Sequence, residues 1–286
     1  MDELYARVNS TTKQALYQFM KDQDISLLKY HFDHYFKFCV QENNIQVLPH
    51  HFSSHKIEGL TVVDELGTSF SYERDNPKVK QNFTLCHELG HFILKHDGNY
   101  FAESIDNQEN LLEREANVFS AVVLMPDIVL LSKIYYSCET FHQVQNSLAV
   151  SKQALFFRLL DFLRKYYSGK DSEIKQAVET YIEGKNASIF RLFHDIREQI
   201  IEEFHQFQPS LINQVKQRVR KVGFVTSLEY PELSNQDNWQ AIKASSINLK
   251  TWLIYNKGKS IAYVWDKEKF SDKEARKKAE LQLLLM

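Results

Sequence analysis

The strongest constraint in this sequence is a group of three ionisable side chains inside an otherwise apolar helical segment. The tetrapeptide FTLC precedes the group and FIL follows it, and between them stands His87-Glu88-Leu89-Gly90-His91. Burying such groups is unfavourable unless they are paired or bound to a metal. On a helix, residues 87 and 91 lie one turn apart on the same face, so both imidazoles can reach one cation. The pattern therefore predicts a buried metal site.

Glu88 adds chemistry to this site, because its carboxylate stands next to the first ligand and can take a proton from a metal-bound water. Two histidine ligands, a glutamate general base and an open position for water are typical of HExxH zinc hydrolases. Zinc lowers the pKa of a bound water from 15.7 to about 7. Manganese or iron(II) also suits two histidines and a carboxylate by ligand type. Because the motif fixes only three positions, a helix that merely contains two histidines is the alternative interpretation.

The third ligand is expected from a helix predicted over residues 108–124, which contains Glu113 and Glu115. At about 100° per residue these positions are about 200° apart, so they cannot serve the same site. Glu113 points towards the side of Ser120, whereas Glu115 lies within an apolar stripe formed by Leu112, Ala116, Phe119 and Val123. A lone carboxylate in an apolar stripe requires a cation, and we therefore predict Glu115 as the ligand. An ordinary buried salt bridge of Glu115 is the alternative.

Three ordered motifs resemble those of the ImmA/IrrE family of metallopeptidases. FTLCHELGH at residues 83–91 is similar to the RFTLAHELGH-type helix of that family, and EANVFSAVVLMP at residues 115–126 is similar to its EAnxFAaxLLMP helix. LAVSKQAL at residues 148–155, followed by Arg158-Leu159, resembles the VSxxAlxxRL stretch that comes next in the family. The resemblance covers roughly residues 45–165.

The resemblance implies a metal-dependent, site-specific endopeptidase inside the cell. Family members typically cut a helix-turn-helix transcriptional repressor, which derepresses a mobile element or a stress regulon. By the same resemblance, His87, His91 and Glu115 are the metal ligands, Glu88 is the catalytic base and zinc is the expected metal. Two rival functions stay open: a catalytically silent module that binds or sequesters a repressor, and a toxin-like protease with broader targets.

The chain departs from the family pattern at two places near the motif. Cys86 replaces the usual small residue before the first ligand, and Lys95 stands where many members carry a histidine, with His96 one residue later. Recognition of the substrate is expected at the edge of a hairpin around residues 59–74, because an extended peptide can add a strand to a sheet edge. The predicted substrate-binding residues are Thr68, Ser69, Phe70 and Ser71.

The fold class predicted from these patterns is α+β. We expect an N-terminal helical segment (residues 1–44), then a helix-rich metallopeptidase domain with a small sheet (45–168), and a helical segment with a small α+β module (169–286). Residues 45–74 contain short β-branched and aromatic runs typical of strands, and TWLIY-NKGK-SIAYVW predicts a second hairpin turning near Gly258. Ser271 and Glu274 form a capping box that opens a last helix. Residues 170–286 carry no motif that indicates a function.

Charge and composition limit the partners and the compartment. The chain has 35 basic and 37 acidic residues, distributed as −5 over residues 1–169 and +3 over residues 170–286. That balance argues against direct binding to DNA, which usually requires a clustered basic surface. The stretch VSKQALFFRL could be a DNA-reading helix-turn-helix, but its apolar character favours packing or substrate docking. The histidine clusters at residues 31 and 34 and at residues 50, 51 and 55 are interpreted as surface or satisfied histidines.

The remaining composition indicates a soluble protein in a reducing compartment. Three widely spaced cysteines, Cys39, Cys86 and Cys138, form neither a disulfide framework nor a CxxC metal pair. No signal-peptide pattern and no run of about 18 apolar residues is evident. We therefore expect a cytoplasmic location and no membrane partner.

Overall fold

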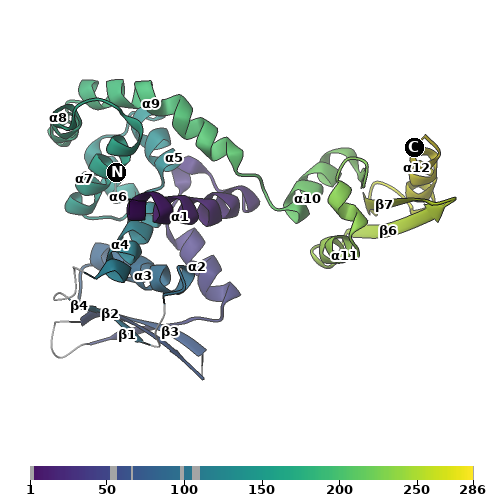
Figure 1. Ribbon diagram of the computed structural model, residues 1–286, viewed down its shortest axis with the longest axis horizontal. Coiled ribbons are helices and arrows are strands. Elements are labelled where there is room, and N and C mark those ends of the chain that lie inside the picture. The colour runs from purple at the N-terminus through teal and green to yellow at the C-terminus, as the bar shows by residue number, and fades with distance from the viewer. Residues whose placement is uncertain (1–2, 52–56, 66, 97–99, 105–109, 286) are drawn as a thin grey trace. The chain divides into compact units, whose positions relative to one another are not determined.

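The computed structural model describes residues 3–51, 57–65, 67–96, 100–104 and 110–285. It divides the chain into two compact units, Met1–Phe207 and Gln208–Met286, which we call the N-terminal and C-terminal units (Figure 1). Both combine helices with a small sheet, which confirms the predicted helix-rich α+β class. The boundary expected near residue 168 is not where the units separate.

The N-terminal unit is built mainly from helices, and its sheet lies on one side of them (Figure 1). The helices are α1 (Glu3–Asp22), α2 (Asp33–Glu42), α3 (Lys78–Ile93), α4 (Leu111–Leu124), α5 (Asp127–Leu130), α6 (Phe141–Ser147), α7 (Lys152–Tyr166), α8 (Asp171–Ile182) and α9 (Ala187–Gln206), with short turns η1 (Leu27–Lys29) and η2 (Leu131–Tyr136). Helices α8 and α9 belong to this unit because Ile174, Tyr181, Ile189 and Phe193 are buried in its hydrophobic core. They therefore extend the unit about 40 residues beyond the predicted boundary.

The sheet of the N-terminal unit contains β1 (Gln46–His50), β2 (Ile57–Asp64), β3 (Gly67–Glu73) and β4 (Tyr100–Ser104). Its order is β1-β3-β2-β4. Strands β2 and β3 form the predicted antiparallel hairpin, β4 pairs antiparallel with β2, and β1 pairs parallel with β3. Helix α3 lies against β2 and β3, so the sheet supports the helix that carries the histidine motif.

Helices α3 and α4 are in close contact, and Gly90 is the residue that allows it. A Cβ atom at Gly90 would lie 3.1 Å from Cδ1 of Phe119 and 3.2 Å from Cα of Ala116. A glycine inside a helix is unfavourable by about 1 kcal/mol relative to alanine. Here its absence of a side chain lets α4 approach the histidine motif.

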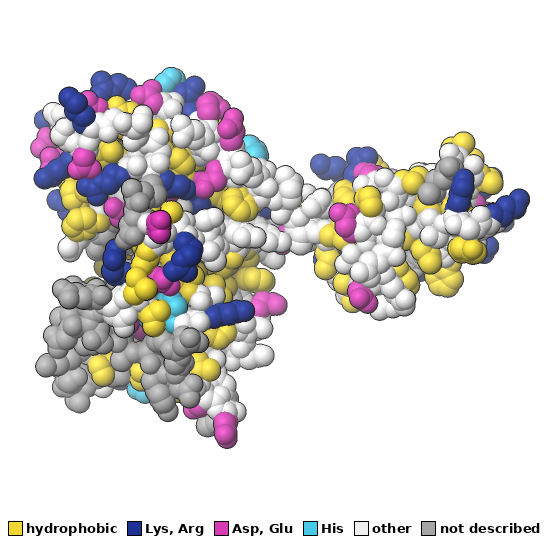
Figure 2. Space-filling model, viewed as in Figure 1, with side chains coloured by type: hydrophobic (Ala, Val, Ile, Leu, Met, Phe, Trp, Pro, Cys, Tyr) yellow, Lys and Arg dark blue, Asp and Glu magenta, His cyan; other side chains and the backbone are white. Residues whose placement is uncertain are grey.

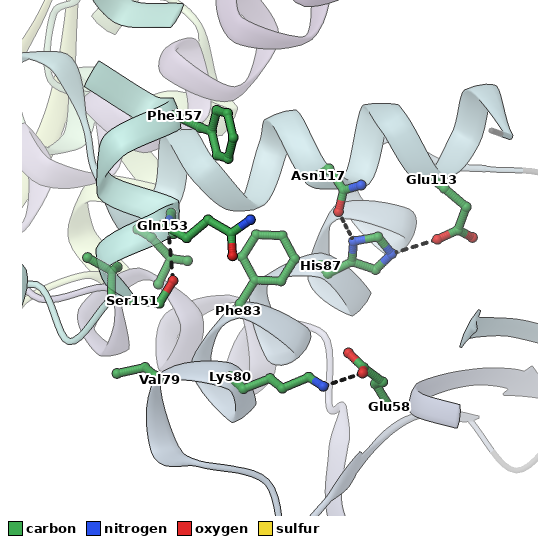
Figure 3. A pocket seen from close by; sticks show the side chains of 13 residues that line it. Glu58, Val79, Lys80, Phe83, His87, Glu113, Asn117, Ser151, Gln153 and Phe157 are labelled. Atoms are coloured by element: carbon green, nitrogen blue, oxygen red, sulfur yellow. Dashed lines mark hydrogen bonds and ion pairs between the residues drawn. The ribbon is translucent and has the colours of Figure 1, made fainter. Parts of the chain in front are cut away.

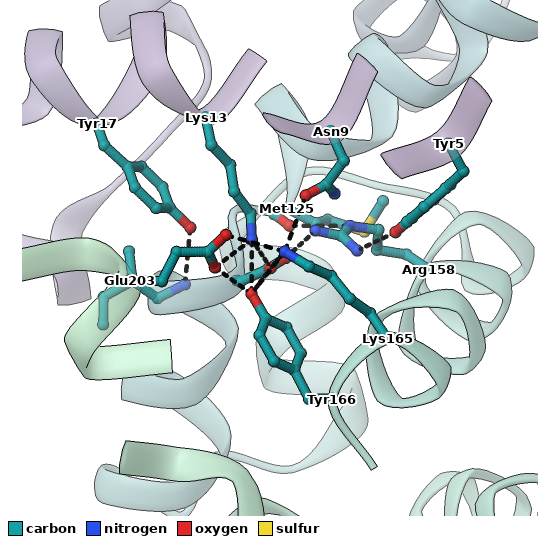
Figure 4. Close-up of polar contacts among 11 residues, drawn as sticks. Tyr5, Asn9, Lys13, Tyr17, Met125, Arg158, Lys165, Tyr166 and Glu203 are labelled. Carbon is teal, nitrogen blue, oxygen red and sulfur yellow. Dashed lines mark hydrogen bonds and ion pairs between the residues drawn. The ribbon is translucent and has the colours of Figure 1, made fainter. Parts of the chain in front are cut away.

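A buried ionic network joins four helices of the N-terminal unit (Figure 4). Lys13 of α1 forms ion pairs with Asp127 of α5 and Glu203 of α9, and Arg158 of α7 also pairs with Asp127. The hydroxyl of Tyr166 donates to Asp127 at 2.6 Å. Burial alone would raise the pKa of Asp127, but the charges of Lys13 and Arg158 hold that pKa well below its usual range. Asp127 is therefore a buried carboxylate satisfied by two cations.

One stretch, Leu111–Tyr136, is long and apolar enough to cross a membrane by length and composition. It spans α4, α5 and η2, and 78% of its most apolar window is buried inside the unit. Such burial is typical of the core helices of soluble proteins.

The C-terminal unit is a three-stranded antiparallel sheet with helices on both faces. Its elements are α10 (Leu211–Val222), β5 (Phe224–Thr226), η3 (Pro231–Ser234), α11 (Gln236–Ala244), β6 (Leu249–Asn256), β7 (Lys259–Asp266) and α12 (Asp272–Leu285). The predicted hairpin is confirmed, and its turn places Gly258 at a φ of +80°. The predicted capping box at the start of α12 is also confirmed, because Ser271 and Glu274 exchange hydrogen bonds.

Candidate metal centre

The two histidines of the motif converge with a glutamate from the neighbouring helix. His87 and His91 project from one face of α3, with their Nε2 atoms 3.1 Å apart. The carboxylate of Glu113, on α4, lies 3.0 Å from Nε2 of His87 and 3.5 Å from Nε2 of His91. All three side chains are buried, and their ligand atoms lie within 4.8 Å of one another. These residues form the candidate metal centre.

Glu113, rather than the predicted Glu115, completes this group in the structure. Glu115 instead accepts a hydrogen bond from the ring of His96 at 3.0 Å and forms an ion pair with Arg7 of α1. The two glutamates do serve different sites, as their angular separation on the helix requires. The choice between them needs correction, because the partners that satisfy Glu115, Arg7 and His96, come from α1 and from the residues after α3, both outside the predicted helix pair. The salt bridge left open for Glu115 is what the structure contains, with Glu115 buried and the side chain of Arg7 62% exposed.

Each histidine is oriented by a partner on its other ring nitrogen. The side-chain oxygen of Asn117 lies 2.9 Å from Nδ1 of His87, and Nδ1 of His96 lies 2.8 Å from Nδ1 of His91. A proton on each Nδ1 satisfies these contacts and leaves the Nε2 lone pairs directed at the common centre. Such outer partners fix the tautomer and orientation of metal-bound histidines. Sequence reasoning did not assign Asn117 a role, although its position four residues after Glu113 places both on one face of α4.

The donor set fits a divalent transition-metal ion. With Nδ1 protonated on both rings, two Nε2 lone pairs and a carboxylate face one another, an arrangement of acceptors that a cation stabilises. Burial lowers the pKa of His91 to about 3, and the neighbouring rings of His87 and His96 add to this shift. His91 is therefore neutral across the physiological pH range, which is the form that binds a metal.

Glu88 lies beside this group, fully buried on α3. The hydroxyl of Thr61, on β2, donates to Oε2 of Glu88 at 2.5 Å. Close approach of β2 depends on Gly59, because a Cβ atom there would lie 2.4 Å from Oε1 of Glu88 and 2.5 Å from Cγ2 of Thr84. The sheet thus positions the carboxylate predicted to act as base, and Thr61 and Gly59 are two functional residues that the sequence did not single out.

A pocket of about 670 Å³ opens from His87, Glu113 and Asn117 (Figure 3). Its walls come from α3, α4 and the first turns of α7, with Glu58 of β2 paired to Lys80 of α3 at one side. The contribution of α7 includes Ser151, which caps that helix by accepting from the backbone N–H of Ala154. The VSKQAL segment therefore borders the candidate site, in agreement with its interpretation as a packing or docking element.

Three of the four predicted substrate-binding residues, Ser69, Phe70 and Ser71, do not lie at a free sheet edge. Strand β3 is an inner strand, with β2 on one side and β1 pairing with residues 69–73 on the other. Phe70 and Ser71 are also buried. A substrate strand therefore cannot add to β3 at residues 69–71, because both of its hydrogen-bonding edges are used there. The expectation of a free edge at Ser69, Phe70 and Ser71 did not foresee the parallel pairing of β1, which precedes the hairpin in the chain; a role of Thr68 in substrate binding stays a prediction.

Comparison with protein families identifies the class to which this site belongs. Residues 40–160 match the family model described as Peptidase_M78, IrrE N-terminal-like domain. This part of the chain is thus similar to a peptidase family whose members are in general metal-dependent, in agreement with the resemblance found in the sequence. The match contains the whole candidate metal centre and the α7 wall of the pocket. No curated protein and no solved structure gave a significant match.

Proposed function

We propose that this protein is a zinc-dependent endopeptidase of the cytoplasm. The observation that carries the proposal is the convergence of His87, His91 and Glu113 beside Glu88, within a segment that matches a peptidase family. Zinc is the first choice because two imidazoles and one carboxylate leave a position open for water. Manganese and iron(II) suit the same donors.

The chemistry divides between the metal and the protein. When bound, a divalent metal would lower the pKa of a water molecule and polarise the peptide carbonyl. Glu88 accepts the proton of the attacking water and passes it to the leaving amine as the peptide bond breaks. Thr61 donates to one oxygen of that carboxylate and holds it in place. Asn117 and His96 keep the two imidazoles in the orientation that the metal requires.

For the substrate we propose a helix-turn-helix transcriptional repressor, whose cleavage would derepress a mobile element or a stress regulon. Support for this partner comes from the resemblance to the ImmA/IrrE family and from the family match over residues 40–160. The obvious candidate is a repressor encoded beside this protein.

The test compares wild type with Glu88→Gln, which preserves the shape of the side chain and removes its capacity as a base. Metal content is measured by mass spectrometry, and cleavage of the neighbouring repressor by the masses of its fragments. We expect both proteins to hold about one equivalent of metal and only the wild type to cut. Equal cleavage by the variant would reject Glu88 as the base. A repressor that binds tightly but stays intact with the wild type would favour the silent binding module.

A further inference from the structure

The pocket beside the candidate metal centre is lined by both apolar and polar side chains. Val79 and Phe83 lie on the same face of α3 as His87, two turns and one turn before it. They therefore line the part of the pocket that extends from His87 along α3. Leu124 and Val150 are almost fully buried and form part of the lining, while Phe157 is 52% exposed. Figure 3 shows Phe83 between His87 and the α7 side chains.

The charges in this pocket select against a charged occupant. Glu58 and Lys80 form an ion pair with each other. Glu113 and His87 belong to the metal-binding end. Neither pair therefore leaves an uncompensated charge for the side chain of a ligand. A charged side chain would lose its hydration there without gaining an opposite charge, whereas an apolar side chain would gain by leaving water.

We propose that this pocket binds a large apolar side chain of the substrate, next to the peptide bond that is cut. This inference rests on the proposed function. Phe157 and Phe83 are then the residues that set specificity. Burial of a leucine-sized side chain favours binding by about tenfold to hundredfold over glycine. The substrate class is a protein segment with leucine, methionine or phenylalanine at this position.

The test measures binding of two probes to the zinc-loaded chain by calorimetry: the hydroxamates of N-acetyl-leucine and of N-acetyl-glycine. We expect the leucine probe to bind at least tenfold more tightly. Phe157→Asp should reduce that ratio to below threefold. Leu28→Asp is the matched control, because Leu28 is 50% exposed and lies outside the pocket.

Equal affinity of the two probes for wild type would overturn the role of the pocket and leave the metal centre standing. Failure of both probes to bind would overturn the pocket together with the metal centre. The two failures are distinguishable because the glycine probe reports on the metal alone.

A second inference comes independently from the C-terminal unit. Its order of elements is helix, strand, short helical turn, helix and β-hairpin, with the first strand paired to the last strand of the hairpin. This is the arrangement of a winged helix, in which α11 takes the place of the DNA-reading helix and the β6–β7 turn forms the wing. Ile242 of α11 and Leu249 of β6 share one hydrophobic core, so the helix is fixed against the sheet.

The charge of this unit matches a polyanionic partner. Residues 208–286 contain 14 basic and 8 acidic residues, a balance of +6, whereas residues 1–207 contain 21 basic and 29 acidic residues, a balance of −8. The expectation against DNA binding rested on a division at residue 169, which added the acidic α8 and α9 to the basic unit. With the structural boundary, the C-terminal unit carries a net positive charge, the sign that favours association with a polyanion, and Figure 2 shows basic side chains on its visible face.

The exposed residues of α11 and of the turn have suitable chemistry. Gln236, Gln240 and Lys243 follow at spacings of four and three, so they share a face of α11, and all three are exposed. Asp237 is the acidic exception beside them. Lys257 stands exposed in the β6–β7 turn and Lys259 stands exposed at the start of β7, and within the described residues neither forms an ion pair. Glutamine amides read base edges and lysines contact phosphates.

We infer that the C-terminal unit binds duplex DNA through α11 and the β6–β7 turn. The test uses the full chain, a fluorescein-labelled 20-base-pair duplex and anisotropy titrations at several salt concentrations. We expect Lys257→Glu with Lys259→Glu to weaken binding more than tenfold and to reduce the salt slope by about 2. The control is Lys273→Glu with Lys277→Glu on α12, which makes the same change in net charge and should weaken binding less than threefold. No binding at low salt, or equal weakening by both pairs of substitutions, would overturn the inference.

Discussion

The assignment of the third ligand makes a sharp prediction, because two glutamates stand two residues apart on α4 with different roles. Glu113 contacts both histidines directly, at 3.0 and 3.5 Å. Glu115 reaches His91 only through His96, over hydrogen bonds of 3.0 and 2.8 Å. Replacing each in turn by glutamine removes one negative charge from the same helix and changes the side-chain volume very little.

The expected magnitudes follow from these positions. Loss of an outer partner typically weakens metal binding by about tenfold to hundredfold, or about 1.4–2.8 kcal/mol. Glu115→Gln should fall within this range, since it loosens His96 and leaves all three ligands in place. Glu113→Gln removes a charged ligand, and we expect its zinc affinity to fall by more than about a hundredfold.

The assay is competition for zinc with a chromophoric chelator at pH 7. Glu139→Gln serves as a control, because Glu139 pairs with Lys133 in the same unit, away from the centre. Circular dichroism establishes that the variants are folded. If Glu115→Gln lost as much affinity as Glu113→Gln or more, the reasoning from distances would be refuted and the ligand predicted from sequence would be restored.

Three further predictions test other parts of the structure. Gly59→Ala should displace Glu88, since the new Cβ would lie 2.4 Å from its Oε1, and we expect a loss of about a hundredfold in kcat of repressor cleavage with metal content unchanged. Asp127→Asn should lower the free energy of unfolding by about 3–5 kcal/mol in urea titrations at pH 7, because it leaves Lys13 and Arg158 without their buried carboxylate. The folded-state pKa of Asp127 is below its unfolded value, so the contribution of Asp127 to the free energy of unfolding is complete above about pH 4 and is lost on further acidification. The difference in free energy of unfolding between wild type and Asp127→Asn should therefore shrink below pH 4. A constant difference would contradict the assignment. Removal of metal by a chelator should lower Tm in calorimetry, with recovery on adding zinc, because a ligand bound only to the folded state stabilises it by mass action; an unchanged Tm would argue against a metal at the centre.

The histidine motif could be placed from sequence because its geometry is local. Residues four apart on a helix share a face whatever surrounds them, so the side chains of His87 and His91 lie next to each other once α3 has formed. The choice between Glu113 and Glu115 depends instead on how α4 is rotated against α3. That rotation depends on the close contact at Gly90 and on the packing of α4 against α1, which is far away in the sequence, and no pattern within α4 contains this information.

Contacts between segments far apart in the sequence also limited the prediction of the strand order and of the boundary between the two units. The β2–β3 hairpin was predictable because its strands are adjacent in sequence, whereas the parallel addition of β1 was not, and the substrate edge was misplaced as a result. In α9, Ile189, Phe193, Ile196 and Ile200 form a recognisable apolar stripe. The sequence gives no indication of which surface covers the stripe, so the helix could not be assigned to the N-terminal unit.

The ionic network around Asp127 has a consequence for how the protein is made. Lys13 lies upstream of the segment that matches the peptidase family and Glu203 lies downstream of it. A ribosome that adds about 5–20 residues per second needs roughly 10–40 s to synthesise the chain from one partner to the other. Over that time the buried lysine lacks one of its two carboxylates, and α9 is not yet available to complete the core. The segment that matches the peptidase family therefore emerges from the ribosome well before α9, which completes its hydrophobic core, has been synthesised.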